Sequence, residues 1–240
     1  MNLVIDIGNT RIKSALFAGN TLYAFKIFDS FEQLLADTDF IHKANHAIIG
    51  SVVEGLDSFI ERLHQKMPTI IFKSSIKIPL ANLYQSVATL GSDRLSAAIA
   101  SYYLHPNSNV LTIDAGTCIK YNFTNNLNEY LGGAISPGIR MRFKSLQHFT
   151  SKLPLVEPDW SYSDVIGRNT QNSILSGVLN GSVAEVDGII DSYKLLYPDI
   201  LVLLTGGDSE FLAKRLKNSI FAHQNLVLNG LNDILNYNLE

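Results

Sequence analysis

The order of hydrophobic and polar residues along the chain predicts an α/β fold that begins with three short strands. Residues 3–8 form an aliphatic run typical of a buried strand. Residues 11–17 alternate polar and apolar side chains, as a strand with one exposed face does. After the turn formers Gly19 and Asn20, residues 21–28 predict a third strand. We therefore expect an antiparallel meander at the N-terminus.

Helices and strands alternate through the following residues. Ser30 with Gln33 three positions later predicts a capping box and a helix to about residue 37. Residues 74–91 show no strong period and predict an irregular, functional loop. Ser92 is expected to cap a helix from Asp93 to about residue 105. The other elements predicted for this part are strands at 46–52 and 70–72 and a helix at 56–66.

The opening pattern then returns about 110 residues later. Residues 4–10 (Val-Ile-Asp-Ile-Gly-Asn-Thr) and residues 112–117 (Thr-Ile-Asp-Ala-Gly-Thr) both end an aliphatic strand with an aspartate, a glycine and a hydroxyl residue. The repeat predicts two similar halves, residues 1–112 and 113–240. The elements predicted for the second half are strands at 109–117, 118–123, 129–135 and 200–204, helices at 138–149, 170–196, 210–217 and 226–237, and an irregular connection at 151–166.

The repeated turns have the chemistry of phosphate binding. A glycine, Gly8 or Gly116, lets a phosphate approach the backbone N–H groups closely. The nearby hydroxyls of Thr10 and Thr117 can donate to phosphate oxygens. A third turn, Gly206-Gly207, follows an apolar strand and precedes a helix, as in many nucleotide sites. One such turn alone is more often an ordinary hairpin turn, so the hypothesis depends on their combination.

Two charged groups extend this hypothesis. The carboxylates of Asp6 and Asp114 stand at strand ends, where they can hold a hydrated cation. Lys13 is close enough in sequence to the first turn to offset phosphate charge. The chain contains no Gly-Lys-Ser or Gly-Lys-Thr, so we do not expect a P-loop.

Composition and charge exclude several other classes of protein. The net charge of −3 leaves no positive excess for a nucleic acid backbone. Cys118 is the only cysteine, which excludes an internal disulfide and fits a reducing compartment. The first residues do not form a signal peptide, and no stretch approaches the length of a membrane span. We therefore expect a cytoplasmic protein that acts on a small molecule, without nucleic acid or membrane partners.

Five motifs occur in an order that resembles a known family. They are Asp6-Ile7-Gly8-Asn9-Thr10, Gly91-Ser92-Asp93-Arg94, Ile113-Asp114-Ala115-Gly116-Thr117, residues 132–138 (Gly-Gly-Ala-Ile-Ser-Pro-Gly) and Gly167-Arg168-Asn169-Thr170. The chain resembles the actin, Hsp70 and sugar kinase superfamily and, within it, the type III pantothenate kinases, over nearly its whole length. The resemblance implies two actin-like (ribonuclease H-like) halves around an interdomain nucleotide cleft.

The resemblance also implies an activity and a set of site residues. The activity is transfer of the γ-phosphoryl group of ATP, supplied with Mg²⁺, to pantothenate, which gives 4′-phosphopantothenate in the first step of coenzyme A biosynthesis. The implied ATP contacts are Asp6, Ile7, Gly8, Asn9, Thr10, Arg11, Ile12, Lys13 and Thr117. The implied pantothenate contacts are Tyr84, Gly91, Ser92, Asp93, Arg94 and Thr170.

Three further roles follow from the same resemblance. Asp93 is implied as the proton acceptor, and Asp114 as the ligand of a monovalent cation, K⁺ or NH₄⁺. The family also implies a homodimer, in which Thr170 reaches the pocket of the neighbouring subunit. The glycines of the long helix, Gly177, Gly181 and Gly188, are small residues that fit a close helix contact within the chain or between two subunits.

The residues themselves support the role of Asp93 but leave alternatives. An aspartate in the first turn of a helix is held ionised by the helix dipole and can accept a proton; it is also common there for purely structural reasons. Arg94 can balance that charge or bind a substrate carboxylate. A non-catalytic ATP-binding regulatory protein, or a kinase of another small hydroxylated acceptor, remains open.

Two positions depart from the family pattern. Ser92 stands where alanine is more common, and Cys118-Ile119-Lys120 stands where Ala-x-Thr is more common. We expect Lys120 to face solvent on its strand, and Cys118 to be a small core residue. We also expect the cluster of Arg140, Arg142 and Lys144 to form a solvated helix face.

Overall fold

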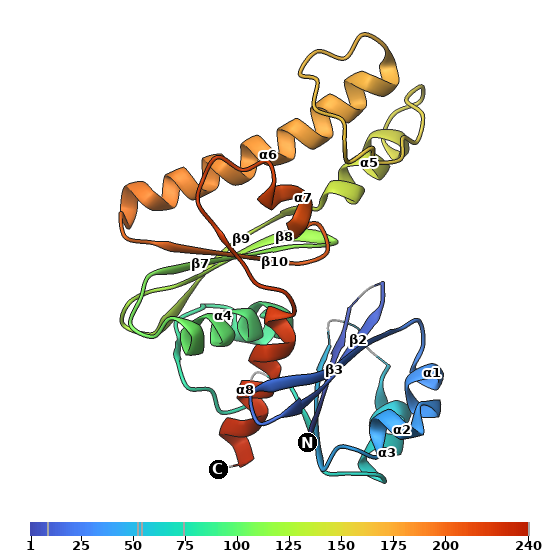
Figure 1. The fold of residues 1–240 in the computed structure, drawn as a ribbon, viewed down its shortest axis with the longest axis vertical. Helices are drawn as coiled ribbons and strands as arrows, with labels where there is room; N and C mark the ends of the chain where they lie inside the picture. Colours follow the sequence, from blue (N-terminus) through green and yellow to red (C-terminus); the bar gives the residue numbers. More distant parts are fainter. Residues whose placement is uncertain (9, 52, 54, 74, 240) are drawn as a thin grey trace. The chain divides into compact units, whose positions relative to one another are not determined.

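The computed structural model describes residues 1–8, 10–51, 53, 55–73 and 75–239 (Figure 1). The chain divides into two compact units. The first unit comprises Met1–Asn107, Thr124–Leu131 and Asn225–Glu240, and the second comprises Ser108–Phe123 and Gly132–Gln224. This division differs from contiguous halves at residues 1–112 and 113–240, because the turn at 124–131 and the C-terminal segment belong to the first unit.

The first unit contains a five-stranded sheet in the order β3-β2-β1-β4-β5. The predicted meander is confirmed, since β1 pairs with β2 and β2 with β3, both antiparallel. β4 lies parallel to β1, and β5 parallel to β4. The strands are β1 (Asn2–Ile7), β2 (Ile12–Ala18), β3 (Thr21–Phe28), β4 (His46–Ser51) and β5 (Thr69–Ile71).

Helices cover both faces of this sheet. Because side chains alternate along a strand, Leu3 and Ile5 face one apolar core, shared with α1 (Phe31–Ala36), α2 (Thr38–Ile41) and α3 (Asp57–His64). Val4 faces a second core, shared with α4 (Ser92–Leu104) and α8 (Leu226–Leu239). The C-terminal helix joins this unit because its leucines and isoleucine complete that second core.

Two local predictions in this unit have clear outcomes. Ser30 caps α1 as predicted, since its side chain accepts a hydrogen bond from the Gln33 N–H. The residues between 74 and 91 are mostly irregular as expected, with a short strand β6 (Ala81–Asn82) and a 3₁₀ helix η1 (Val87–Thr89). The sequence did not reveal α2, which begins where the Asp37 carboxylate accepts from the Phe40 N–H.

The second unit contains one sheet with helices packed on a single apolar core. The strand order is β11-β10-β7-β8-β9, and β6 pairs with the first residues of β9, which belong to the first unit. The strands are β7 (Val110–Ala115), β8 (Cys118–Thr124), β9 (Glu129–Pro137), β10 (Leu201–Thr205) and β11 (Phe221–Ala222).

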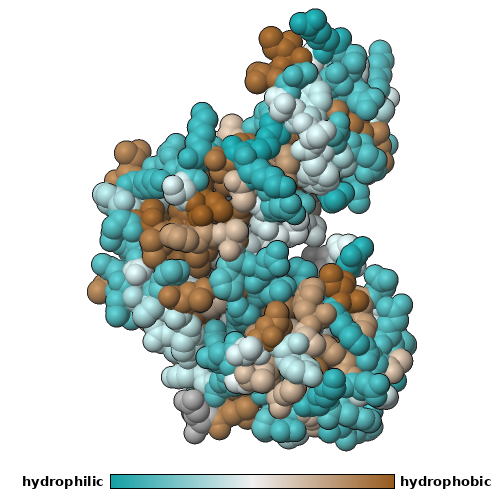
Figure 2. All heavy atoms as spheres, viewed as in Figure 1, coloured by the Kyte–Doolittle hydropathy of each residue, from teal (hydrophilic) through white to brown (hydrophobic). Residues whose placement is uncertain are grey.

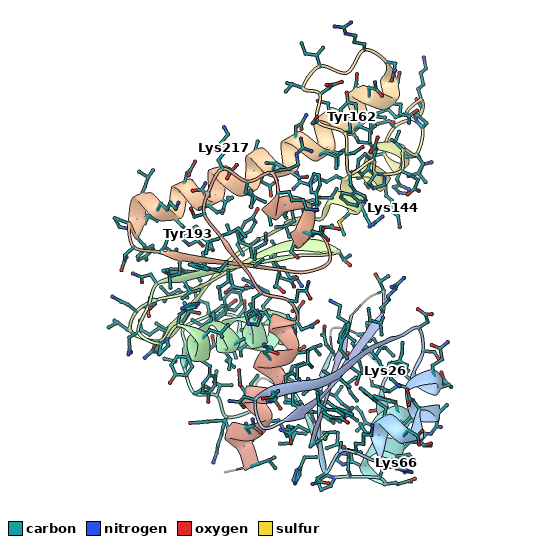
Figure 3. All side chains as sticks on the ribbon, in the orientation of Figure 1. Lys26, Lys66, Lys144, Tyr162, Tyr193 and Lys217 are labelled. Atoms are coloured by element: carbon teal, nitrogen blue, oxygen red, sulfur yellow. The ribbon has the colours of Figure 1, made fainter. Side chains whose placement is uncertain are left out.

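The long helix α6 (Thr170–Leu196) covers the sheet of this unit, with α5 (Ile139–His148) and α7 (Ser209–Ala213) beside it (Figure 1). Tyr193 of α6 lies between the helix and the sheet (Figure 3), and its ring centroid is 5.4 Å from that of Phe123 in β8. The prediction of one helix over 170–196 is confirmed.

The helix predicted over 210–217 is shorter than expected. α7 ends at Ala213, and the N–H groups of Lys217 and Asn218 donate to the carboxylate of Asp187 on α6. These backbone groups therefore bond to a side chain on another element instead of continuing the helix. Among the helices that the structure describes, none has both the length and the apolar character needed to span a membrane.

Candidate active site

The first glycine hairpin joins β1 to β2. Asp6 and Lys13 are directly opposed in the register of the two strands, and the Gly8 N–H donates to the Arg11 carbonyl oxygen across 3.2 Å. Ile7 and Ile12 point into the core, so only their backbone is available to a ligand. Thr10 and Arg11 are exposed, whereas Asp6, Gly8 and Lys13 are half-buried. Asn9 lies outside the described residues.

The beginning of α4 lies at the same end of the sheet. Ser51 ends β4 and is the register partner of Ile7. The Ser92 hydroxyl donates to the Ser51 carbonyl oxygen, with 3.2 Å between the two oxygens. This bond overturns the prediction that Ser92 caps the helix. Gly91 occupies the cap position, and Ser92, which is buried, uses its hydroxyl to hold α4 against the sheet.

Asp93 stands in the first turn of α4. Its side chain is half-buried, and its Oδ1 accepts a hydrogen bond of 2.8 Å from the Arg94 N–H. Acidic side chains are common in the first turn of a helix, where the positive end of the helix dipole lies. Asp93 therefore combines a negative charge with partial access to solvent, as a proton acceptor requires.

Arg94 and Tyr84 come together as the resemblance implied. Arg94 is only 5% exposed, and its Nη1 donates to the Tyr84 hydroxyl across 3.4 Å. The guanidinium carbon lies 5.3 Å from the centroid of the Tyr84 ring. Tyr84 in turn is held by the Tyr130 ring, 6.1 Å away between centroids. The irregular loop thus places an aromatic ring against the buried guanidinium of the residue that follows Asp93, a suitable environment for a substrate carboxylate.

The second glycine hairpin joins β7 to β8 in the second unit. The Gly116 N–H donates to the Cys118 carbonyl oxygen across 3.0 Å, and Thr117 is exposed at the tip. The Gly138 N–H donates to the Thr117 carbonyl oxygen across 3.1 Å. A Cβ at position 138 would lie 2.2 Å from the Gly116 carbonyl oxygen, so only glycine fits against the hairpin there.

The third glycine turn contacts this hairpin. β10 is parallel to β7, with Thr205 opposite Asp114. Gly206 has a φ of +98°, and a Cβ at this position would lie 2.3 Å from the Ala115 carbonyl oxygen. By contrast, a Cβ at Gly207 would meet no atom within 4 Å. Burial raises the pKa of Asp208 in the same turn, and the charge of Arg140 partly opposes that rise.

Lys120 was expected to face solvent, but its side chain is largely buried. Its Nζ lies 2.6 Å from Oδ2 of Asp114, and the two side chains are only 18% and 13% exposed. The carboxylate that was expected to bind a monovalent cation therefore already has an ammonium group beside it. The residues around Asp114 therefore do not fit a monovalent cation bound at the place that the Lys120 ammonium group takes.

Thr170 belongs to the second unit, whereas the other predicted substrate contacts belong to the first. It is exposed at the first position of α6, and no hydrogen bond, ion pair or ring contact of the described residues joins it to Asp114 or Thr117. Asn169 caps the helix by accepting from the Asn172 N–H across 2.8 Å. The Ser176 hydroxyl also holds the preceding loop by donating to the Val165 carbonyl oxygen.

A polar cluster around Glu185 of α6 was not predicted from the sequence. Its carboxylate accepts from the Tyr121 hydroxyl (3.2 Å), the Ser136 hydroxyl (2.5 Å) and the Arg142 guanidinium (2.5 Å). Burial opposes ionisation of Glu185, but these bonds outweigh it and lower its pKa. The prediction of a solvated face is thus wrong for Arg142, because its partner lies more than forty residues away in sequence.

The remaining candidates for metal binding are few. Among the described residues, no three His, Cys, Asp or Glu side chains come together in the manner of a metal centre. Mg²⁺ does not need such a centre, because it keeps several waters and binds through substrate phosphates and one or two carboxylates. Cys118 is half-buried beside the second hairpin, not in the core as expected.

Solved structures first define the class of this fold. A ROK family glucokinase from Streptomyces griseus, solved with glucose and AMPPNP, aligns over 97% of this chain and 98% of its own with a TM-score of 0.58 at 11% identity. A ROK hexokinase from Thermus thermophilus gives a TM-score of 0.55 over 99% of both chains at 12% identity. A Baf family protein from Campylobacter jejuni gives 0.68 at 23% identity, over 99% of this chain and 98% of its own. The fold is that of the actin-like ATPases and sugar kinases.

Sequence similarity defines the family within that class. The family model of type III pantothenate kinases matches residues 2–192. The type III pantothenate kinase of Christiangramia forsetii is 44% identical over 99% of both chains, and that of Cytophaga hutchinsonii is 41% identical over the full length of both. The chain belongs to the type III pantothenate kinase family. It is a phosphotransferase that uses ATP to phosphorylate pantothenate in coenzyme A biosynthesis.

Proposed function

We propose that this chain phosphorylates pantothenate with Asp93 as the proton acceptor, and that the segment Gly91–Arg94 and Tyr84 bind the acceptor substrate. The observation that supports this assignment is the hydrogen bond from Ser92 to Ser51. It holds the first turn of α4 at the end of the sheet where β1 leads into the first glycine hairpin. The candidate base and a candidate phosphate loop are thereby parts of one compact unit.

The proposed reaction needs little covalent chemistry from the protein. The primary hydroxyl oxygen of pantothenate forms a bond to the γ-phosphorus, while the bond from that phosphorus to the bridging oxygen breaks and ADP leaves with that oxygen. Asp93 orients the hydroxyl and accepts its proton. Phosphoryl transfer of this kind depends mainly on positioning and on neutralising charge. Arg94 binds the carboxylate of pantothenate, and the Tyr84 ring holds the guanidinium in place.

The glycine hairpins are proposed to bind ATP through backbone N–H groups and hydroxyls. The first would contribute residues 6–13, with Lys13 offsetting phosphate charge, and the second would contribute Thr117. Gly138 and Gly206 support the second hairpin by packing against its backbone. Mg²⁺ would arrive with the ATP phosphates and stabilise their charge. This division of roles would give two actin-like halves of one working unit, one built mainly from residues 1–112 and the other mainly from residues 113–240.

A homodimer is proposed from the surface of the second unit. Phe149, Val165 and Ile166 are about four-fifths exposed, at 80%, 80% and 78%. Phe149 also lines a hollow of about 440 Å³, together with Met141 and Leu155 among others. Figure 2 shows hydrophobic atoms gathered at this end of the unit, over the segment before α6. A second copy of the chain would cover this surface, and Thr170 would reach the neighbouring subunit's substrate.

The glycines of α6 support the same proposal. A Cβ at Gly177, Gly181 or Gly188 would meet nothing within 4 Å. They therefore serve no close packing within the described chain and are open to another helix. Mutating Val165 and Ile166 to serine should shift the mass measured by light scattering to that of a monomer.

The cytoplasm is the proposed compartment, since a protein with one cysteine and no disulfide fits a reducing environment.

The acceptor substrate is tested with a panel of compounds. The purified protein is incubated with ATP, Mg²⁺ and, separately, pantothenate, glucose, N-acetylmannosamine and a no-acceptor blank, and ADP release is followed. We expect turnover with pantothenate alone. ADP release with a sugar but not with pantothenate would assign the protein to another kinase activity. Nucleotide binding without turnover on any acceptor would favour a regulatory role.

A further inference from the structure

Lys120 and Asp114 form an ion pair on the polar face of the second hairpin. Along β7, Ile113 and Ala115 face the apolar core, and along β8, Ile119 and Tyr121 do so. The alternation of side chains therefore places Asp114 and Lys120 together on the opposite face. Their charged atoms are 2.6 Å apart, and both side chains are largely withdrawn from water.

A carboxylate with little solvent access needs a positive charge nearby. Burying a charge without a partner costs much more than burying a hydrogen-bonded pair. A monovalent cation bound at Asp114 would supply that charge, and so does a lysine ammonium group. K⁺ and an ammonium group carry the same charge and have nearly the same size. They would therefore compete for the same place beside Oδ2.

We infer that Lys120 replaces a bound monovalent cation in this chain, so that catalysis proceeds without K⁺ or NH₄⁺. The inference rests on the proposed function, because the cation requirement is measured on pantothenate phosphorylation. The ammonium group is held on the hairpin whose tip, Thr117, is proposed to bind phosphate. Because it is tethered to β8, it supplies this charge at any salt composition.

A matched control variant can separate this role of Lys120 from simple support of the fold. Lys120 lies three residues beyond the hairpin tip, on the face away from the apolar core. A second lysine–aspartate pair, Lys26 of β3 with Asp37, bridges strand and helix in the first unit. It offers a matched control, because removing Lys26 also breaks an ion pair but changes nothing at Asp114.

The experiment compares wild type, Lys120→Ala and Lys26→Ala in equal concentrations of KCl or tetramethylammonium chloride. We expect wild type and Lys26→Ala to turn over pantothenate at rates within about two-fold in the two salts. Lys120→Ala should lose roughly 10- to 100-fold in tetramethylammonium, and K⁺ or NH₄⁺ should restore most of that loss. Lys120→Arg should stay independent of K⁺, since it keeps the charge.

Binding of the cation is measured without turnover. Tl⁺ serves as a K⁺ probe, followed by thallium NMR, and the melting temperature is recorded in each salt. Tl⁺ should bind Lys120→Ala and not wild type, and K⁺ should raise the melting temperature of the variant alone. If Lys120→Ala does not fold, Lys120→Met tests the same loss of charge while keeping the length of the side chain.

Different results would overturn the inference and the proposed function. A wild-type enzyme that loses about ten-fold or more in activity without K⁺ would overturn the inference, as would a Lys120→Ala enzyme indifferent to K⁺. If pantothenate is not phosphorylated in any salt, the proposed function fails instead. Binding of Tl⁺ to wild type at Asp114 would then still refute the replacement of the cation by Lys120.

Discussion

The hydroxyl of Ser92 donates a hydrogen bond to the backbone carbonyl of Ser51, with 3.2 Å between Oγ and O. Ser51 is also the register partner of Ile7, the residue that precedes the first glycine turn. One hydroxyl on α4 therefore joins the helix that carries Asp93 to the strand that lies beside the proposed phosphate loop. We expect the geometry of the proposed acceptor site to depend on this contact.

Replacing Ser92 by alanine should lower the free energy of unfolding by about 1 kcal/mol, because a partly buried hydrogen bond is lost. We also expect a fall in kcat, since the first turn of α4 is held less firmly. Ser101→Ala is the matched control. Its hydroxyl bonds to the Ala98 carbonyl within the same helix, so stability should fall without a change in kcat. Equal kcat in both variants would remove Ser92 from the positioning role.

Replacing Asp93 by asparagine should reduce kcat by roughly 10²- to 10⁴-fold, the range typical for loss of a general base. The dissociation constant for ATP should stay within about two-fold of wild type, because the proposed ATP contacts are untouched. Both values are measured by a coupled assay and by calorimetry. Glu32→Gln, in the first turn of α1, controls for the loss of one helix-terminal charge. Retention of the full rate in Asp93→Asn would exclude Asp93 as the base.

Replacing Arg94 by lysine should raise the KM for pantothenate about ten-fold and leave the KM for ATP unchanged. Lysine keeps the charge but cannot form the planar, paired bonds to a carboxylate that arginine forms. Tyr84→Phe removes the hydroxyl that Arg94 contacts and keeps the ring, so its effect should be smaller. An equal rise in both KM values would show that Arg94 supports the whole site instead of binding pantothenate.

Replacing Gly206 by alanine should destabilise the second hairpin by more than about 2 kcal/mol, since the new Cβ overlaps the Ala115 backbone at a positive φ. Gly207→Ala, one residue later, meets open space and should change stability by less than about 0.5 kcal/mol. Chemical denaturation of the two variants measures the difference. Similar losses in both would contradict the close approach of Gly206 to Ala115.

The stability of the first unit should depend on pH through Asp233 of α8. Burial raises its pKa to about 6, above its ordinary value of 3.8. The folded protein therefore binds this proton more tightly than the unfolded chain, and stability is lost as the pH rises through about 6. Asp233→Asn should be more stable than wild type by about 1 kcal/mol at about pH 8, after allowance for solvent screening.

That advantage should vanish at about pH 4, where the wild-type carboxyl is largely protonated when folded. Melting curves across this range measure it. Asp39→Asn, at an exposed position of α2, is the control and should follow wild type at every pH. A constant difference between Asp233→Asn and wild type across the range would mean that the substitution acts through packing and not through the proton.

Local patterns predicted most of the fold. The aliphatic run of β1, the alternation in β2 and the Ser30 cap all act within a few residues, and each was found as expected. The family resemblance also grouped Tyr84 with Arg94, and the two side chains are in contact. The end of α7 and the partner of Arg142 could not be predicted, because Asp187 and Glu185 reach these groups from a distant part of the chain.

Two errors in the predicted site have the same origin. Serine is a common helix-capping residue, but the Ser92 hydroxyl donates to a carbonyl of β4. Sequence spacing cannot reveal this partner. Lys120 has the spacing of an exposed strand residue, but its face of the sheet also carries Asp114. In each case a polar side chain found a partner set by tertiary structure, and local preference did not decide its position.

The central claim is tested most directly by following the γ-phosphorus of ATP. The purified protein is incubated with γ-labelled [³²P]ATP, Mg²⁺ and pantothenate, and the products are separated and identified by mass. We expect label in 4′-phosphopantothenate with wild type and almost none with Asp93→Asn. Label that stays in ATP, or that appears only as inorganic phosphate while the folded protein binds both substrates, would contradict it.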